Sequence, residues 1–202
     1  MGLHERRQRE KEETRQRILD ASLELFLKEG LVQVSLRRIA TEIEYSPAAI
    51  YRYFSSRDEI LWALCSDGFD KLRLWLEKKP RRDPRRQVRR LGLAYLGFAS
   101  ANPQLYDLMF LQTNPLKVPR DDPRWAQYTT AYQPLRAAVR ACQAAGYLKG
   151  VSAEAVSFSL WSMVHGMVSL VIKDRCLMYN PIQTKIYGLE ALNFILKSIM
   201  RT

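Results

Sequence analysis

Apolar residues recur at helical spacing along nearly the whole chain, and no segment keeps strand-like alternation for long. The pattern therefore predicts an all-α protein of about nine helices. Four expected helices are 12–29, a short one capped by Ser35, a shorter one opened by Ser46-Pro47, and one from Ser56 toward Lys79. The others are expected at 84–100, 103–112, 122–146, 152–177 and 181–200.

Proline positions support this division. A proline at the first helical position loses no hydrogen bond, because the N–H of that position has no intrahelical partner. A capping side chain just before it accepts one of the other unpaired N–H groups. Lone Pro134 falls inside a helical pattern and predicts a kink or break there. Five prolines follow a capping residue, in Ser46-Pro47, Asp83-Pro84, Asn102-Pro103, Asp122-Pro123 and Asn180-Pro181.

Charge is unevenly distributed along the chain. The formal net charge is +11, which suits a polyanionic partner. Residues 1–60 hold 11 basic and 11 acidic residues, so the whole excess lies in 61–202. An arginine run falls in that second part, and it is interpreted as a solvated face, a wider electrostatic footprint on DNA, or an attraction for an anionic partner. The run consists of Arg81, Arg82, Arg85, Arg86, Arg89 and Arg90.

The three cysteines, Cys65, Cys142 and Cys176, have neither disulfide-framework nor zinc-ligand spacing. The chain also lacks a glycine-rich phosphate loop, paired carboxylates at catalytic spacing, and a nucleophile–base motif. We therefore expect no enzyme activity, no metal and no cofactor. The charged N-terminus lacks a signal-peptide apolar stretch and is interpreted as a frayed, solvated entry to the first helix, so a cytoplasmic location is expected.

Three helices fall within the first sixty residues, and the last two are joined by a turn at Glu44-Tyr45-Ser46. Such a pair is a helix-turn-helix, whose second helix enters the DNA major groove. The stretch Thr14–Leu61 reads TRQRILDASLELFLKEG and then VSLRRIATEIEYSPAAIYRYFSSRDEIL. It resembles the tetracycline-repressor (TetR) family in its Ile-Leu-x-Ala, Ser-Leu-x-x-Ile-Ala, Ser-x-x-x-Ile-Tyr-x-Tyr-Phe and Ser-Arg-Asp-Glu segments.

The resemblance implies a DNA-binding domain over residues 1–60 and an effector-binding and dimerisation domain over 61–202. It also implies roles for individual residues. Ser35 and Arg57, at helix starts, and Tyr53 are expected at phosphates, with Arg37 and Arg38 adding charge. Arg52 is expected to read guanine or bind phosphate. The residues expected at or near the groove are Ser46, Pro47, Ala48, Ala49 and Tyr51.

The C-terminal part holds a segment without charge, Ala155–Ile172, which includes Trp161, His165 and Gly166. These three resemble the Trp…His-Gly signature of one C-terminal subfamily. The length allows a membrane span, but four serines, His165 and Gly166 favour a helix buried in protein. The family implies that the last two helices pair with those of a second copy in a four-helix bundle.

The resemblance further implies a small apolar or aromatic effector that releases a repressor from a palindromic operator. An effector pocket is concave and mostly apolar, with few polar groups. Each candidate residue for it also has an ordinary interpretation as core. The candidates are Trp75, Tyr95, Phe98, Tyr106, Phe110, Trp125, Tyr128, Trp161 and His165. Two alternatives stay open: a DNA-binding regulator without an effector, and an all-helical protein attached to membranes.

Overall fold

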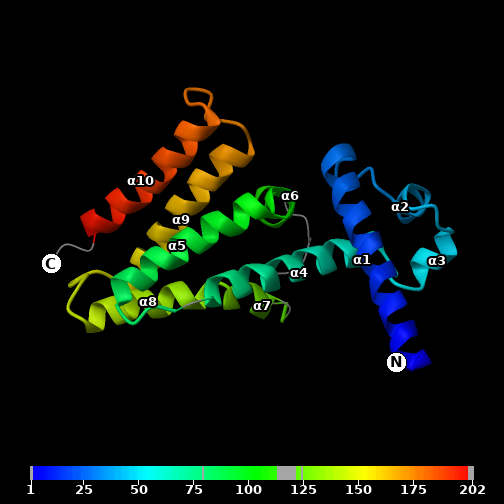
Figure 1. Cartoon of the computed structure of the whole chain (residues 1–202), viewed down its shortest axis with the longest axis horizontal. Coiled ribbons are helices and arrows are strands. Elements are labelled where there is room, and N and C mark those ends of the chain that lie inside the picture. Colours follow the sequence, from blue (N-terminus) through cyan, green and yellow to red (C-terminus); the bar gives the residue numbers. More distant parts are fainter. Residues whose placement is uncertain (1, 79, 113–121, 124, 200–202) are drawn as a thin grey trace. The chain divides into compact units, whose positions relative to one another are not determined.

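The computed structural model describes residues 2–78, 80–112, 122–123 and 125–199, and this part of the chain is helical without strands (Figure 1). All-α architecture is therefore confirmed. The helices are α1 (Leu3–Glu29), α2 (Leu36–Glu42), α3 (Pro47–Tyr51), α4 (Arg57–Glu77), α5 (Pro84–Ala101), α6 (Pro103–Tyr106), α7 (Trp125–Thr130), α8 (Gln133–Ala144), α9 (Ala153–Ile172) and α10 (Pro181–Ile199). A π-helical segment, η1 (Asp107–Leu111), directly continues α6.

The chain divides into two compact units. The first unit contains residues 1–68 and 104–119, and the second contains 69–103 and 120–202. Helix α4 contributes its N-terminal part to the first unit and its C-terminal part to the second. The functional division at residue 60 stays a prediction.

The core of the first unit follows the predicted apolar face of α1. Ile18, Leu19 and Phe26 are almost fully buried, and the Ser22 hydroxyl donates to the Ile18 carbonyl at 2.6 Å. Helices α2 and α3 are held on this core by Ile39 and Ile50, which have no exposed surface. Burying such side chains contributes about 1.5–3 kcal/mol each, so short helices that would not form alone become stable.

Helix α1 starts at Leu3, so the expected start near Glu12 and the expected fraying are wrong. Its first turns bury nothing, and an apolar pattern therefore gives no sign of them. Charge pairing at i, i+4 supports them instead, as in Arg6 to Glu10 at 2.8 Å. The Glu5 carboxylate also accepts from the Gly2 N–H at 3.0 Å, which caps the helix start.

Ser56 caps the start of helix α4 as predicted, but the capping interactions also involve Ser55. The Ser56 hydroxyl accepts the Glu59 N–H at 3.1 Å, but the Glu59 carboxylate binds the Ser55 N–H and hydroxyl rather than Ser56. Further along α4, Gly68 faces the α6–η1 segment. A Cβ at Gly68 would lie 2.4 Å from Met109 Sδ, so glycine permits this close approach.

The second unit is built around α5, which contacts α8, α9 and α10. Phe98 of α5, Val139 of α8 and Leu192 of α10 are at most 1 % exposed and form its centre. A Cβ at Gly92 would lie 3.0 Å from the Leu192 side chain, so glycine lets α10 come close to α5. The second unit thus has its own core.

Two predicted helices of the second unit end differently. The expected 122–146 helix is broken, with α7 ending at Thr130 and Pro134 in the first turn of α8, as that proline predicted. However, α7 begins at Trp125 rather than at the Asp122-Pro123 pair. Helix α9 ends at Ile172 instead of 177, because Asp174 adopts a left-handed φ of 49° that no helix continues.

Three arginines of the run have partners within the fold. Arg90 donates from Nη1 to the Lys78 carbonyl at 2.6 Å and from Nη2 to the Leu76 carbonyl, so it caps the C-terminal end of α4. Arg89 donates to Asn193 of α10 at 2.8 Å, and Arg85 lies 4.5 Å from the Tyr147 ring. Arg85 and Arg89 remain exposed, so the solvated-face interpretation still fits them, whereas half-buried Arg90 is bound to the backbone at the end of α4.

Candidate DNA-binding and effector sites

The helix-turn-helix is formed by α2, a tight turn and α3. Glu44 adopts a left-handed φ of 58°, and the Tyr45 N–H donates to the Ala40 carbonyl at 2.9 Å. This conformation reverses the chain within a few residues, close to the turn that the sequence predicted. Ile50 and Phe54 then fix one side of the α3 segment in the core.

The opposite side of the α3 segment is open to solvent. Ser46, Pro47, Ala48, Tyr51 and Arg52 are exposed, and Ala49 and Tyr53 are half-buried. Tyr51 is 56 % exposed, so its ring is available for a contact on this face. The structure thus brings the predicted groove residues together on one face.

The predicted serines cap their helices. The Ser35 hydroxyl accepts the Arg38 N–H at 3.1 Å, and the Ser46 hydroxyl accepts the Ala49 N–H at 3.2 Å. Both residues remain exposed, so capping and a contact with a ligand on the solvent side are compatible.

The predicted arginines differ in what they already bind. Arg38 is bound by two carboxylates, Glu29 at 2.8 Å and Glu42 at 2.7 Å, and these hydrogen bonds raise the pKa of its guanidinium. Arg57 donates to the carbonyls of Leu31 and Val32 and pairs with Asp58. Their side chains therefore have structural partners that the sequence did not reveal.

Arg37 and Arg52 present the opposite case. Both side chains are exposed, and among the described residues neither is part of an ion pair. They are the predicted cations most available to a polyanion.

Two arginines that the sequence interpretation missed support the helix-turn-helix from α1. Arg17 lies with its guanidinium 5.5 Å from the Tyr45 ring, and Arg15 lies 5.7 Å from the Phe54 ring. Arg15 also approaches Asp67 of α4 at 3.6 Å. Helical periodicity could have indicated the position of Arg15, because it places Arg15 on the same face of α1 as the buried residues Ile18 and Ser22.

In the second unit, three of the predicted effector residues form one polar cluster. Trp161 Nε1 donates to the Tyr95 hydroxyl at 3.3 Å, and that hydroxyl lies 3.3 Å from His165 Nδ1. The Trp161 and His165 rings are 5.4 Å apart. Partial burial lowers the pKa of His165, so the imidazole is neutral at neutral pH.

The other predicted effector residues do not join this cluster. Phe98 is fully buried in the core. Tyr106 and Phe110 belong to the first unit, where their rings stack at 4.8 Å. The side chains of Trp125 and Tyr128 lie outside the described part of the structure.

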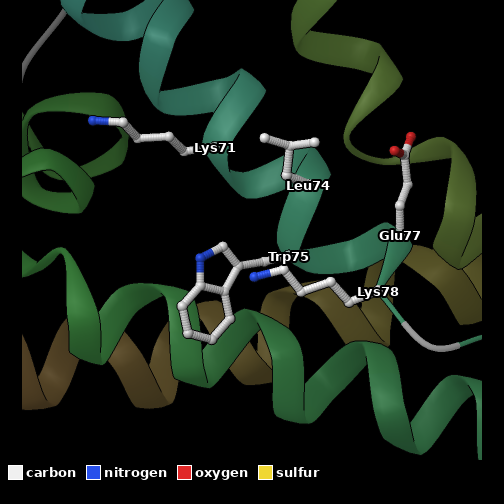
Figure 2. Close-up of a pocket in the computed structure, with 5 residues that line it drawn as sticks. All are labelled: Lys71, Leu74, Trp75, Glu77 and Lys78. Carbon is white, nitrogen blue, oxygen red and sulfur yellow. The ribbon is translucent and has the colours of Figure 1, made fainter.

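Trp75 lines an open pocket of about 410 Å³ on the second-unit part of α4 (Figure 2). The Lys78 ammonium lies 5.1 Å from its ring, and Lys71, Leu74 and Glu77 complete the described lining. On its other side the ring packs closely on α5, since a Cβ at Gly97 would lie 2.8 Å from Trp75 Cζ3. Of the nine predicted effector residues, Trp75 is the one that lines this pocket in the described part of the chain.

Judged by length and composition alone, α9 is a described helix that could cross a membrane. Its buried side consists of Val156, Ser157, Leu160, Val164 and Val168, and the rest is largely uncovered. The expectation of a helix buried in protein is therefore met on one side only. The uncovered apolar side chains of α9, the following loop and α10 are Phe158, Leu170, Val171, Leu177, Met178, Tyr179, Ile182, Ile186, Tyr187, Leu189 and Phe194.

Two family models match the chain. Residues 18–64 match the bacterial regulatory proteins of the tetR family, and residues 88–183 match a tetracyclin repressor-like C-terminal domain. The first match covers α2, α3 and the C-terminal part of α1, and the second covers α9 and most of α5. Both parts of the chain therefore point to one family.

Individual proteins agree with these matches. The HTH-type transcriptional regulator HbdR of Aromatoleum sp. (strain CIB) is 24 % identical over 76 % of this chain and 68 % of its own length. SrpR of Pseudomonas putida, also an HTH-type transcriptional regulator, is 38 % identical over 32 % of this chain and 30 % of its own. The TetR family regulator PfmR of Thermus thermophilus has the same fold, with a TM-score of 0.74 and 23 % identity over 91 % of this chain and 99 % of its own. The chain belongs to the TetR family of DNA-binding transcriptional regulators.

Proposed function

We propose that this regulator is a homodimeric repressor that places one α3 of each copy in the major groove of a palindromic operator and is released by a small effector. The observation that carries the DNA-binding part is the exposed face of the α3 segment, where Tyr51 and Arg52 stand beside small Ala48. The proposal accounts for an aromatic side chain that is 56 % exposed.

The chemistry of this face suits DNA. A short side chain such as Ala48 permits close approach and an apolar contact with a thymine methyl group. Arg52 can bind guanine through two hydrogen bonds or a phosphate through one charge. Arg37, exposed at the start of α2, adds a cation on the same motif. Phosphate contacts would supply most of the affinity, and base contacts the selectivity.

Dimerisation through α9 and α10 rests on their uncovered apolar side chains. A soluble monomer rarely leaves so many large apolar side chains exposed, with Ile182 at 72 % and Phe194 at 70 %. A second copy with the same surface would bury them in a four-helix bundle. Two recognition helices related by a two-fold axis suit a palindromic operator, whose half-sites lie about one helical turn, roughly 34 Å, apart.

Small residues on α9 support the same interface. Ala155, Ser159, Ser162 and Gly166 recur at helical spacing on the less buried side. Among the described residues, leaving aside its chain neighbours and the nearby backbone of α9, nothing lies within 4 Å of where a Gly166 Cβ would stand, so their packing does not require glycine there. Since glycine inside a helix costs about 1 kcal/mol relative to alanine, close approach by a second helix supplies a reason for it.

The effector site is proposed at Tyr95, Trp161 and His165. A Tyr95 hydroxyl that accepts from Trp161 Nε1 can at the same time donate to Nδ1 of a neutral His165. A small ligand with one polar group and an aromatic body could compete for these hydrogen bonds. It would release the operator if it bound the DNA-free state more tightly than the DNA-bound state.

The DNA-binding proposal is tested by selecting operators from random duplexes and measuring their affinity by fluorescence anisotropy. Tyr51→Ala and Arg52→Ala should each weaken selective binding by about tenfold or more, a base contact being worth about 1–3 kcal/mol. Lys28→Ala removes an exposed cation of the same unit from the last turn of α1 and should change affinity little. Equal losses in all three variants, or no selected sequence, would contradict the proposed α3 interface.

The effector proposal is tested by screening small aromatic acids and amines for release of the selected operator. Trp161 should report binding through its fluorescence, and Tyr95→Phe should weaken the effective compounds while leaving operator affinity intact. Compounds that act equally well on Tyr95→Phe would place the effector elsewhere. A screen in which no compound weakens DNA binding would favour a regulator without an effector.

A further inference from the structure

We propose that the N-terminal extension of α1, residues 3–14, is a second DNA-contacting element that binds phosphates beyond those reached by the α3 segment. This inference rests on the proposed function, since it assigns a further contact to the same complex. It concerns one face of the extension, formed by His4, Arg7, Gln8 and Lys11.

The extension is a helix without a core. Leu3 starts α1, yet Ile18 is its first buried side chain, and the described side chains from His4 to Glu13 are all exposed. At 1.5 Å per residue, residues 3–14 rise about 18 Å along the helix axis. The match to the tetR-family model also begins only at residue 18. A helical segment whose side chains from His4 to Glu13 are all exposed has its surface available for a partner.

Charges are segregated around this helix. At about 100° per residue, His4, Gln8 and Lys11 lie within about 35° of the direction in which Ile18, Leu19 and Ser22 are buried, and Arg7 lies about 65° from it, at the edge of the sector. The acidic residues of the extension, Glu5, Glu10, Glu12 and Glu13, all fall outside this sector. The face is therefore basic and polar, although residues 1–60 as a whole are neutral.

The available cations are on this face. Arg7 and Lys11 are exposed, and among the described residues neither takes part in an ion pair. Arg6 points to the other side of the helix and is already bound by Glu10 at 2.8 Å. A polyanion would therefore meet unneutralised charge on the proposed face and neutralised charge on the opposite one.

The same face continues toward the helix-turn-helix. Arg15, on this side of α1, lies over the Phe54 ring at the end of the α3 segment. The extension then runs on past α2 and α3 (Figure 1). Duplex DNA carries one phosphate charge per about 1.7 Å of its axis, so a rise of about 18 Å passes several phosphates. Since the face has no large apolar side chain, its chemistry favours a phosphate backbone over a protein partner.

The test compares two double variants that remove the same charge from opposite faces of one helix. Arg7→Gln/Lys11→Gln removes the proposed contacts, and Arg6→Gln/Arg9→Gln removes two cations from the opposite face. Glutamine keeps a high helix propensity, and circular dichroism would check that both variants retain their helix content. Operator affinity is measured by anisotropy at several salt concentrations, on duplexes with short and with long flanks.

We expect Arg7→Gln/Lys11→Gln to bind about tenfold or more weakly at low salt, and the salt dependence to fall by about 0.9 in slope for each lost phosphate contact. Arg6→Gln/Arg9→Gln should keep a slope close to that of the unchanged protein, and shortening the flanks should reduce the difference between the two variants. Equal losses in both, or no loss in either, would overturn the inference while leaving the α3 interface in place. An unchanged protein that selects no operator would overturn the proposed function and this inference together.

Discussion

The two compact units of this chain leave very different surfaces to solvent. Among the large exposed hydrophobic side chains of the described residues, the first unit contributes Val32 and Tyr51. The second contributes all the others, most of them on α9, α10 and the loop between them. The first unit has completed its core and presents a mainly polar surface, whereas the second has an apolar face that this chain does not cover. One surface suits a hydrated polyanion, and the other suits a copy of itself.

The net positive charge of the chain does not lie in the part that contains the helix-turn-helix. The net charge of +11 lies entirely in residues 61–202, but the helix-turn-helix lies in residues 1–60, which are neutral. In the second part, Arg90 caps α4 and Arg89 binds Asn193, so part of the excess serves the fold. In the first part, carboxylates neutralise Arg6 and Arg38 and leave Arg37 and Arg52 available. The arrangement of charges, rather than their total, indicates the DNA-binding surface.

The largest effect should come from placing charge on the uncovered face of the second unit. Ile186→Asp/Leu189→Asp would bury two carboxylates at the proposed dimer interface, which costs several kcal/mol. We expect a monomer by light scattering and a loss of operator affinity of about 100-fold or more, because one recognition helix then binds without the other. Val32→Asp is the matched control, since it places the same group on the exposed side chain of the first unit.

Either of two results would contradict the proposed difference between the surfaces of the two units. If Ile186→Asp/Leu189→Asp stays dimeric, the uncovered face does not form the dimer. If Val32→Asp also yields monomers, the first unit contributes to dimerisation and its surface is not as complete as its burial indicates.

The fold was largely predictable because capping pairs and apolar spacing are local signals. Asp83-Pro84 and Asn180-Pro181 start α5 and α10 as predicted, and Gly30 ends α1. The start of α1 was missed because charge pairing rather than apolar spacing supports it. The end of α9 was missed because it depends on the backbone conformation of Asp174.

The candidate sites were predictable to different degrees. The α3 face follows from a motif in one short segment, so its residues could be named from sequence. The cluster of Tyr95, Trp161 and His165 joins α5 to α9, and spacing along the chain does not say which of nine aromatic or histidine candidates will meet. The partners of Arg38 and Arg57 were likewise invisible, because Glu29 and the Leu31 carbonyl come near only after folding.

A smaller effect is expected from the arginines of the second unit. Arg90→Ala leaves the carbonyls of Leu76 and Lys78 without their donor at the end of α4. Removing these charge-assisted hydrogen bonds should lower the free energy of unfolding by about 1–3 kcal/mol in urea denaturation. Arg86→Ala removes an exposed arginine from the same run and should change it by less than about 0.5 kcal/mol. Equal values for the two would show that Arg90, despite its geometry, belongs to the solvated part of the run.

The smallest effect concerns the pH dependence of the second unit. Partial burial lowers the pKa of His165 below its ordinary value of 6.5, so the folded state binds this proton less readily than the unfolded state does. Stability from this residue is therefore complete above pH 6.5 and is lost as the pH falls through the lowered pKa. Tyr95 contacts the imidazole, and Tyr132 packs against the neighbouring Trp161 ring, where burial raises the pKa of its phenol, so Tyr132 stays neutral in this range; His4 is exposed on α1. The melting temperature should thus fall more between pH 7.5 and pH 5 in the unchanged protein than in His165→Gln, as thermal unfolding would show. Identical pH profiles would mean that the imidazole is protonated as easily in the folded chain as in the unfolded one. The contact between Tyr95 and His165 would then have to form with a positively charged imidazole as well.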